Sequence, residues 1–177
     1  MDGEPMGGTV NDTDRKPTRM VDVGEKDITF RRAVASGSIR VGRTVRKAID
    51  AGKIPKGNVL EVARVAGIMA AKQTAALLPL CHPLPIEAVS LHLETDDETV
   101  RVHAEVRTHA RTGVEMEALV AVSVACLTVY DLCKSLPDGQ SAVIETIRLD
   151  EKSGGAGGHF VFPVSSGKGD VPCDSRF

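Results

Sequence analysis

The feature that most constrains this chain is an uninterrupted apolar run near its middle. Residues 118–130 read ALVAVSVACLTVY and contain no charged side chain, while Glu117 precedes them and Asp131 follows them. A helix that is apolar on every side is buried on every side, so we expect this segment to form the centre of the core. The run is too short for a membrane span, which needs about 20 apolar residues.

Polar residues mark both ends of this predicted helix. Thr112 is followed three residues later by Glu115, a capping-box pattern that predicts a helix beginning near Gly113. Glu117 and Asp131 lie about 20 Å apart along one such helix. Either the two polar ends do separate jobs, or one site combines opposite ends of helices from two subunits. We favour the shared site.

Length and composition indicate one soluble domain. The chain has 177 residues, 42% of them hydrophobic, and a net charge of −2, which argues against general attraction to nucleic acids or membranes. Residues 19–164 should form the domain, residues 1–18 a disordered tail, and residues 165–177 a polar tail. Four cysteines without a CxxC pair, and no signal peptide, predict free thiols in a reducing cytoplasm.

The order of predicted elements indicates an α+β fold. We expect an extended segment over 28–41, helices over 43–51, 58–78 and 113–134, a hairpin of strands 86–94 and 100–109, a strand over 142–149, a flexible glycine loop over 152–158, and a short apolar segment over 159–164. This order is close to βαββαβ, which predicts a ferredoxin-like antiparallel sheet with helices packed on one face.

Four polar clusters interrupt the apolar pattern at loops and helix ends. They are Lys56-Gly57, Cys81-His82-Pro83, Glu115-Met116-Glu117, and Asp131 with Lys134. No Walker motif surrounds the first, and no second Cys/His pair accompanies the second, which excludes a P-loop and makes zinc binding unfavourable.

Each cluster also has a purely structural interpretation. Asp131 and Lys134 share a helix face and can form an ordinary surface ion pair. His82 can be a hydrogen-bonded turn residue, Glu115 can be part of a cap, and the glycine loop can be a linker or a mobile lid. A catalytic role requires that Asp131 and Lys134 lie in a cleft where they can transfer protons.

Three long segments resemble one known family. They read MVDVGEKDITFRRAVASG from Met20, KGNVLEVARVAGIMAAKQTAALLPLCHPLP from Lys56, and TGVEMEALVAVSVACLTVYDLCK from Thr112. These segments are similar to the molybdenum cofactor biosynthesis protein C family, over about residues 20–155.

The resemblance implies a specific reaction and assembly. Members of the family are cyclic pyranopterin monophosphate synthases, lyases that convert (8S)-3′,8-cyclo-7,8-dihydroguanosine 5′-triphosphate to cyclic pyranopterin monophosphate and diphosphate. They form homo-hexamers, trimers of dimers, with active sites at subunit interfaces. No cofactor is required, although Mg²⁺ can accompany the triphosphate.

The resemblance also assigns roles to individual residues. The catalytic group matches Asp131, Lys134 and Lys56. The substrate-binding group matches Leu80, Cys81, His82, Glu115, Met116, Glu117 and Lys152, and no metal ligand is implied.

The chain departs from the family pattern at three lysines. Arg111, Asp138 and Ala156 stand where the family usually has lysine. We expect an active enzyme with weaker triphosphate binding. The alternative is a divergent, non-catalytic oligomeric paralogue that binds a pterin or a nucleotide.

Overall fold

A computed structural model describes residues 17–163 of the chain. The predicted tails fall almost wholly outside these residues. The elements, in order, are β1 (Thr29–Arg40), α1 (Arg43–Asp50), α2 (Val59–Ala71), α3 (Thr74–Leu77), β2 (Ala88–Thr95), β3 (Thr99–Ala110), α4 (Glu115–Cys133), a 3₁₀ turn η2 (Gly139–Ser141), β4 (Val143–Ser153) and β5 (Phe160–Val161).

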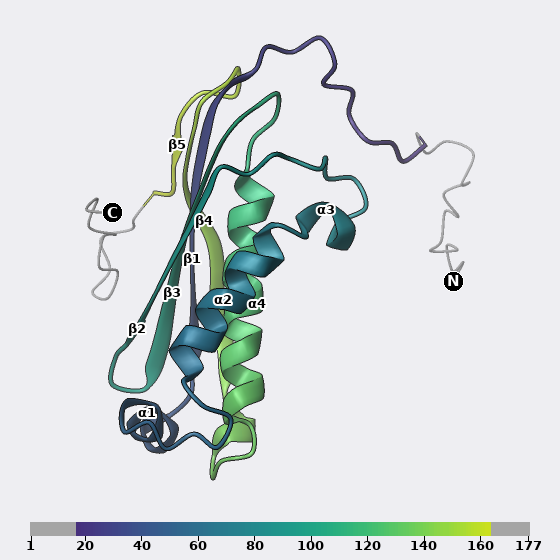
Figure 1. Cartoon of the computed structure of the whole chain (residues 1–177). Helices are drawn as coiled ribbons and strands as arrows, with labels where there is room; N and C mark the ends of the chain where they lie inside the picture. The colour runs from purple at the N-terminus through teal and green to yellow at the C-terminus, as the bar shows by residue number, and fades with distance from the viewer. Residues whose placement is uncertain (1–16, 164–177) are drawn as a thin grey trace, which may run out of the picture.

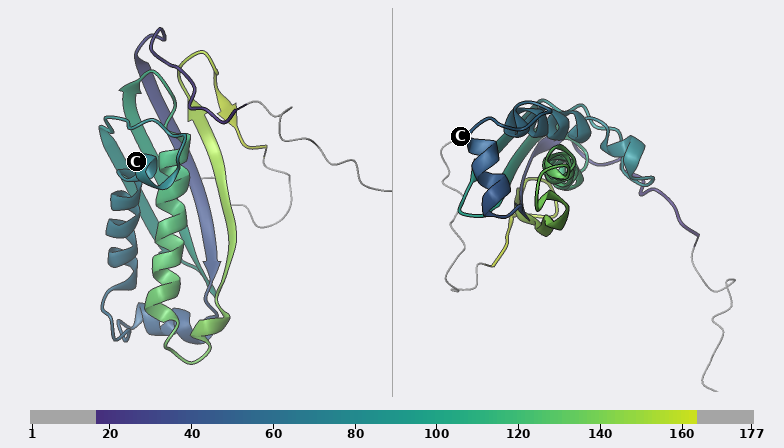
Figure 2. Two further views of the ribbon diagram at one scale, coloured as in Figure 1. Left: turned by 90° about the vertical axis from the view of Figure 1, so that its right-hand side faces the viewer. Right: turned by 90° about the horizontal axis from the view of Figure 1, so that it is seen from below.

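The strands form one antiparallel sheet in the order β2-β3-β1-β4-β5. Strand β1 lies in the middle and pairs with β3 from Thr29 to Arg40, and with β4 on its other side. Helices α2 and α4 pack side by side on one face of the sheet (Figure 1 and Figure 2). The predicted α+β, ferredoxin-like arrangement is therefore confirmed, with β5 as an added edge strand.

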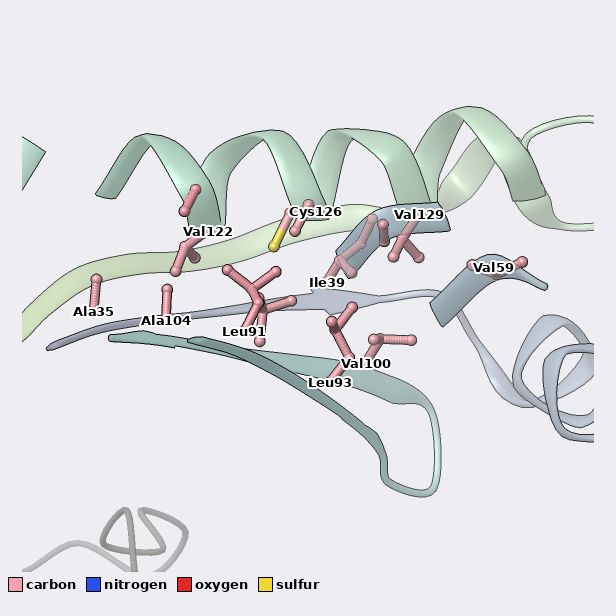
Figure 3. Close-up of a cluster of buried hydrophobic side chains, with 14 of the residues drawn as sticks. Ala35, Ile39, Val59, Leu91, Leu93, Val100, Ala104, Val122, Cys126 and Val129 are labelled. Carbon is pink, nitrogen blue, oxygen red and sulfur yellow. The ribbon is translucent and has the colours of Figure 1, made fainter. Parts of the chain in front are cut away.

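The core lies between α4 and the sheet. Val122, Cys126 and Val129 of α4 point toward the sheet, where Ala35 and Ala104 lie opposite Val122 and Ile39 lies near Val129, and all of these side chains are buried (Figure 3). These small and β-branched side chains let the helix approach the strands closely, consistent with a chain that has 3% aromatic residues.

The prediction that α4 is buried on every side is wrong. On the face turned away from the sheet, Leu127 is 56% exposed and Met116 is 40% exposed. The reason is that a sheet covers only one side of a helix, and α2 flanks α4 on another. An apolar strip is left uncovered within the single chain.

By length and composition alone, α4 could cross a membrane, contrary to the expectation from its apolar run. Half of that segment is buried inside the fold, and its buried side chains pack against the sheet. Packing of this kind is typical of the core helix of a globular domain.

The structure corrects two helix boundaries. Val114, not Thr112, occupies the N-cap position of α4, and no side chain caps the helix. The predicted helix over 58–78 ends at Ala71 and resumes as the short α3. At the break, the buried Thr74 donates its hydroxyl to the Ala71 carbonyl at 2.9 Å, and the Gln73 amide donates to the Ala70 carbonyl at 2.9 Å, one residue closer than in an α-helix.

The fourth strand is longer than predicted. Strand β4 continues to Ser153, so Lys152 lies in a strand that pairs with Ala33 and not in the glycine loop. Residues 151–153 stay extended because they pair with β1, and Glu151 and Lys152 also pair with β5 on the other side. Two ion pairs accompany this pairing, Glu151 with Arg32 at 2.8 Å and Lys152 with Glu115 at 3.2 Å.

Candidate functional site

The two ends of α4 carry two separate charged clusters. We call the C-terminal cluster, Lys56, Asp131 and Lys134, the lysine end. We call the N-terminal cluster, Glu115, Glu117 and Lys152 with the neighbouring Cys81, the acidic end. In Figure 1 the acidic end is at the top of α4, near α3, and the lysine end is at the bottom, near α1.

At the lysine end, one carboxylate holds two ammonium groups. Asp131 accepts hydrogen bonds from Lys134 Nζ at 2.8 Å and from Lys56 Nζ at 2.9 Å. Lys56 also donates to the Asp131 main-chain carbonyl at 3.1 Å. Cations are favoured at a helix C-terminus because its last carbonyls carry partial negative charge. Two lysine charges against one carboxylate give this exposed cluster a net positive charge.

The pKa values at this end follow from the same contacts. Hydrogen bonds from Lys134 and then Lys56 lower the pKa of Asp131 to about 2. The hydrogen bond to Asp131 raises the pKa of Lys134 above its ordinary value. Near neutral pH, Asp131 is therefore an anion and Lys134 a cation, and neither is poised to exchange a proton in this arrangement.

A tight turn before α2 positions Lys56 in this cluster. Ile54 is buried and anchors the loop, and the Gly57 amide donates to the Ile54 carbonyl at 3.0 Å in a tight turn. Asn58 then caps α2 by accepting a hydrogen bond from the Glu61 amide at 3.2 Å. Lys56 is held at the apex of this turn, facing the end of α4.

At the acidic end, Glu115 folds back over the chain that enters α4. The Glu115 carboxylate lies against Gly113: a Cβ there would be 1.8 Å from Glu115 Oε2, so a larger residue would require the Glu115 side chain to move. Glu115 Oε1 pairs with Lys152 Nζ at 3.2 Å. This long-range ion pair links the first turn of α4 to the end of β4, and the cap predicted at Thr112 is not formed.

Glu117 is the buried carboxyl group of this end. It is only 4% exposed. Burial raises the pKa of Glu117 to about 7, partly opposed by a hydrogen bond to its own amide and reinforced by the charge of Glu115. Glu117 is thus divided between its neutral and ionised forms near neutral pH.

The segment after α3 brings the predicted Leu80, Cys81 and His82 toward the acidic end. Burial raises the pKa of the Cys81 thiol, and the nearby charge of Glu117 raises it further. Cys81 and His82 are half-buried, whereas Leu80 and Met116 are exposed. The structure therefore groups Cys81 with Glu115, Glu117 and Lys152, and separates them from the lysine end by most of the length of α4.

One charged residue near the acidic end was missed by the sequence prediction. Arg31 donates to the main-chain carbonyls of Arg111 and Gly154. The sequence could have indicated it, because side chains alternate between the two faces of a strand. Arg31 therefore lies on the same face of β1 as Ala33 and Ala35, which face the helices. A charge on the core-facing side of a strand calls for a specific partner.

The described residues contain no group of three or more His, Cys, Asp or Glu side chains that could hold a metal ion. Cys81, Cys126 and Cys133 are free, and Cys173 lies outside the described residues. The candidate site residues within 17–163 present carboxylates, lysines, a thiol and an imidazole.

Comparison with known proteins gives a consistent result. The model of the MoaC family matches residues 20–155. A relative named cyclic pyranopterin monophosphate synthase from Heliobacterium modesticaldum is 51% identical over 81% of this chain and 90% of its own length. One of the same name from Nocardioides is 53% identical over 82% and 90%, respectively. Cyclic pyranopterin monophosphate synthase 3 of Mycobacterium tuberculosis is 53% identical over 80% of each chain.

Proposed function

Because this chain belongs to the MoaC family, we propose that it is a cyclic pyranopterin monophosphate synthase. It is a lyase of molybdenum cofactor biosynthesis. It converts (8S)-3′,8-cyclo-7,8-dihydroguanosine 5′-triphosphate to cyclic pyranopterin monophosphate and diphosphate. Forming a cyclic monophosphate from a triphosphate requires that an oxygen of the same molecule attack the α-phosphorus while the bond to diphosphate breaks.

The observation that carries this proposal is the lysine end. Lys56 and Lys134 present two ammonium groups held by one carboxylate, at an exposed surface where a polyanion can reach them. Ammonium groups fixed in advance can stabilise the charge that develops on a departing diphosphate. Asp131 acts here as the residue that orients both lysines, since its pKa of about 2 makes it a weak proton acceptor.

Glu117 is the group best suited to exchange protons with the rearranging ring system. A general acid or base is most effective when its pKa lies near the working pH. Burial places the pKa of Glu117 at about 7. Glu117 with the nearby Cys81, and His82 next to Cys81 in the chain, would provide donors and acceptors for the edge of the purine-derived base, while Lys152 and Glu115 form the rim.

The two ends must come from different subunits to act on one substrate. Glu117 and Asp131 are separated by about 20 Å along a continuous helix. A two-fold axis that pairs the outer faces of two antiparallel copies of α4 would bring an acidic end to each lysine end. Each such dimer would contain two complete sites, and three dimers would form a homo-hexamer.

An exposed apolar surface supports this assembly. Val62, Val65 and Met69 form an i, i+3, i+7 stripe along α2, and Met69 is 61% exposed. Leu127 of α4 adds to the same helical layer. A second copy of the chain is the occupant we propose, because only a partner carrying the opposite end of α4 would also complete the site.

The reaction as proposed requires no redox or organic cofactor. Mg²⁺ bound to the triphosphate is compatible with it, and we place the enzyme in the cytoplasm. The direct experiment is to incubate the purified protein with the cyclised triphosphate and to measure diphosphate and cyclic pyranopterin monophosphate. Binding of the triphosphate without diphosphate release would instead support the non-catalytic paralogue.

Subunit mixing tests the shared site. Glu117→Ala and Asp131→Asn should each be inactive. After the two proteins are mixed and reassembled, about one quarter of the sites should be intact, because half of the random pairs are mixed and each mixed pair regains one site of two. Subunit exchange is verified with differently tagged chains. Complete exchange without recovered activity would refute the shared site.

A further inference from the structure

Arg31 joins three backbone carbonyls that belong to two distant segments. Its guanidinium donates to the carbonyls of Ala110 at 3.3 Å, Arg111 at 3.4 Å and Gly154 at 3.3 Å. Ala110 and Arg111 lead into α4, whereas Gly154 follows β4. These connections lie at the same end of the molecule (Figure 1). A planar guanidinium with five N–H donors can bridge several acceptors, which a single ammonium group cannot do in the same geometry.

The start of the glycine loop is shaped around this arginine. Gly154 and Gly155 have φ values of +95° and +69°. A Cβ at Gly155 would lie 1.7 Å from Arg31 Nη1, and a Cβ at Gly154 would lie 1.9 Å from the Phe30 carbonyl oxygen. Glycine is therefore needed at both positions so that the loop can rest directly on β1 and Arg31. A flexible linker would show no such fit.

The segments that Arg31 joins carry the ion pair of the acidic end. Glu115 lies four residues after Arg111, and Lys152 lies two residues before Gly154. These two side chains meet at 3.2 Å. The relative placement of the first turn of α4 and the end of β4 decides whether they can meet.

We propose that Arg31 is a positioning residue for substrate binding, which holds the glycine loop (residues 154–158) and the entry to α4 in register so that Lys152 and Glu115 form one rim of the site. The proposal rests on the proposed function for its substrate. Arg31 acts through the backbone of these segments and does not itself have to contact the substrate.

Substitution of Arg31 separates positioning from charge. In Arg31→Lys the positive charge remains, but one ammonium cannot hold all three carbonyls. We expect KM for the cyclised triphosphate to rise about tenfold in both Arg31→Lys and Arg31→Ala, with a much smaller change in kcat. Wild-type KM in Arg31→Lys would overturn the proposal, because charge alone would then suffice. Arg40→Lys is the matched control on the same strand, since the Arg40 guanidinium pairs with the Glu145 side chain at 2.7 Å and bridges no carbonyls among the described residues.

A second variant tests the contact from the other side. Gly155→Ala places a methyl group where the guanidinium lies, so it should also raise KM and should displace the loop. Alanine at position 155 also strains a backbone with φ +69° whatever residue stands at position 31, so part of its effect should remain in Arg31→Ala. If the two changes share a contact, together they should still raise KM by less than the product of their separate effects. Fully additive effects on KM would refute the shared contact.

Hydrogen exchange provides a readout that needs no substrate. In Arg31→Lys, the amides of residues 154–158 should exchange faster, while the amides of the β1–β3 ladder remain protected. Unchanged exchange in the loop would overturn the positioning role, whatever the activity. Faster exchange in a protein that lacks synthase activity would preserve the positioning role and refute the proposed function instead.

Discussion

Replacing Glu117 by glutamine should make the stability of this protein depend differently on pH. Glutamine has nearly the same shape but cannot ionise. Glu117 is 4% exposed, and burial raises its pKa from 4.5 to about 7. Because one pKa unit corresponds to 1.36 kcal/mol, ionising this side chain in the folded protein costs about 3 kcal/mol relative to the unfolded chain.

The sign follows from proton binding. Below about pH 4.5 Glu117 is neutral in both states, so it adds no pH dependence. Between pH 4.5 and 7 the unfolded chain loses this proton first, so the native state binds more protons and the free energy of unfolding falls as pH rises. Above pH 7 the full cost is present. Relative to the wild type, Glu117→Gln should therefore gain about 3 kcal/mol of stability between pH 4 and pH 8.

Urea denaturation at fixed protein concentration and at several pH values would measure this difference. Glu115→Gln is the matched control two residues earlier in the same helix. Glu115 pairs with Lys152, so removing its charge should bring no gain in stability at pH 8. Parallel stability curves for the wild type and Glu117→Gln would refute the reasoning. A loss of stability at high pH would mean that a cation faces Glu117 in the assembled protein.

Three further predictions concern other parts of the molecule. Lys134→Ala should lower kcat at least about 100-fold in a diphosphate-release assay while the melting temperature changes little, because the side chain is exposed and outside the core; near wild-type turnover would remove the lysine end from the mechanism. Ala156→Lys should lower KM roughly fivefold at low salt, about 1 kcal/mol for one exposed charge, and an unchanged KM would place the loop away from the phosphates. Gly67→Ala should destabilise the fold by about 1–3 kcal/mol in urea titrations, since its Cβ would lie 2.8 Å from the Ala121 carbonyl oxygen and 2.7 Å from Leu91; equal or greater stability would show that α2 can shift away from α4 without cost.

The local sequence was sufficient to predict those elements whose own hydrophobic pattern identifies them. The apolar run of residues 118–130 predicted α4, and the alternating hairpin predicted β2 and β3. Asp131 and Lys134 lie three residues apart, so their contact at 2.8 Å follows from helix geometry alone. The separation of the two ends of α4 follows from the same geometry, and the shared site that this separation suggests stays a prediction.

Only the tertiary structure decided the contacts between segments far apart in the chain. Lys56 reaches Asp131 across 75 positions, and Arg31 reaches Gly154 across 123. The cap predicted at Thr112 is not formed, and Glu115 pairs with Lys152 instead. Lys152, predicted in a loop, lies in a strand because β1 pairs with it. A local pattern describes what a segment favours by itself. The free energy of a segment in the fold also includes partners that the pattern does not contain, and at both ends of α4 those partners set the geometry.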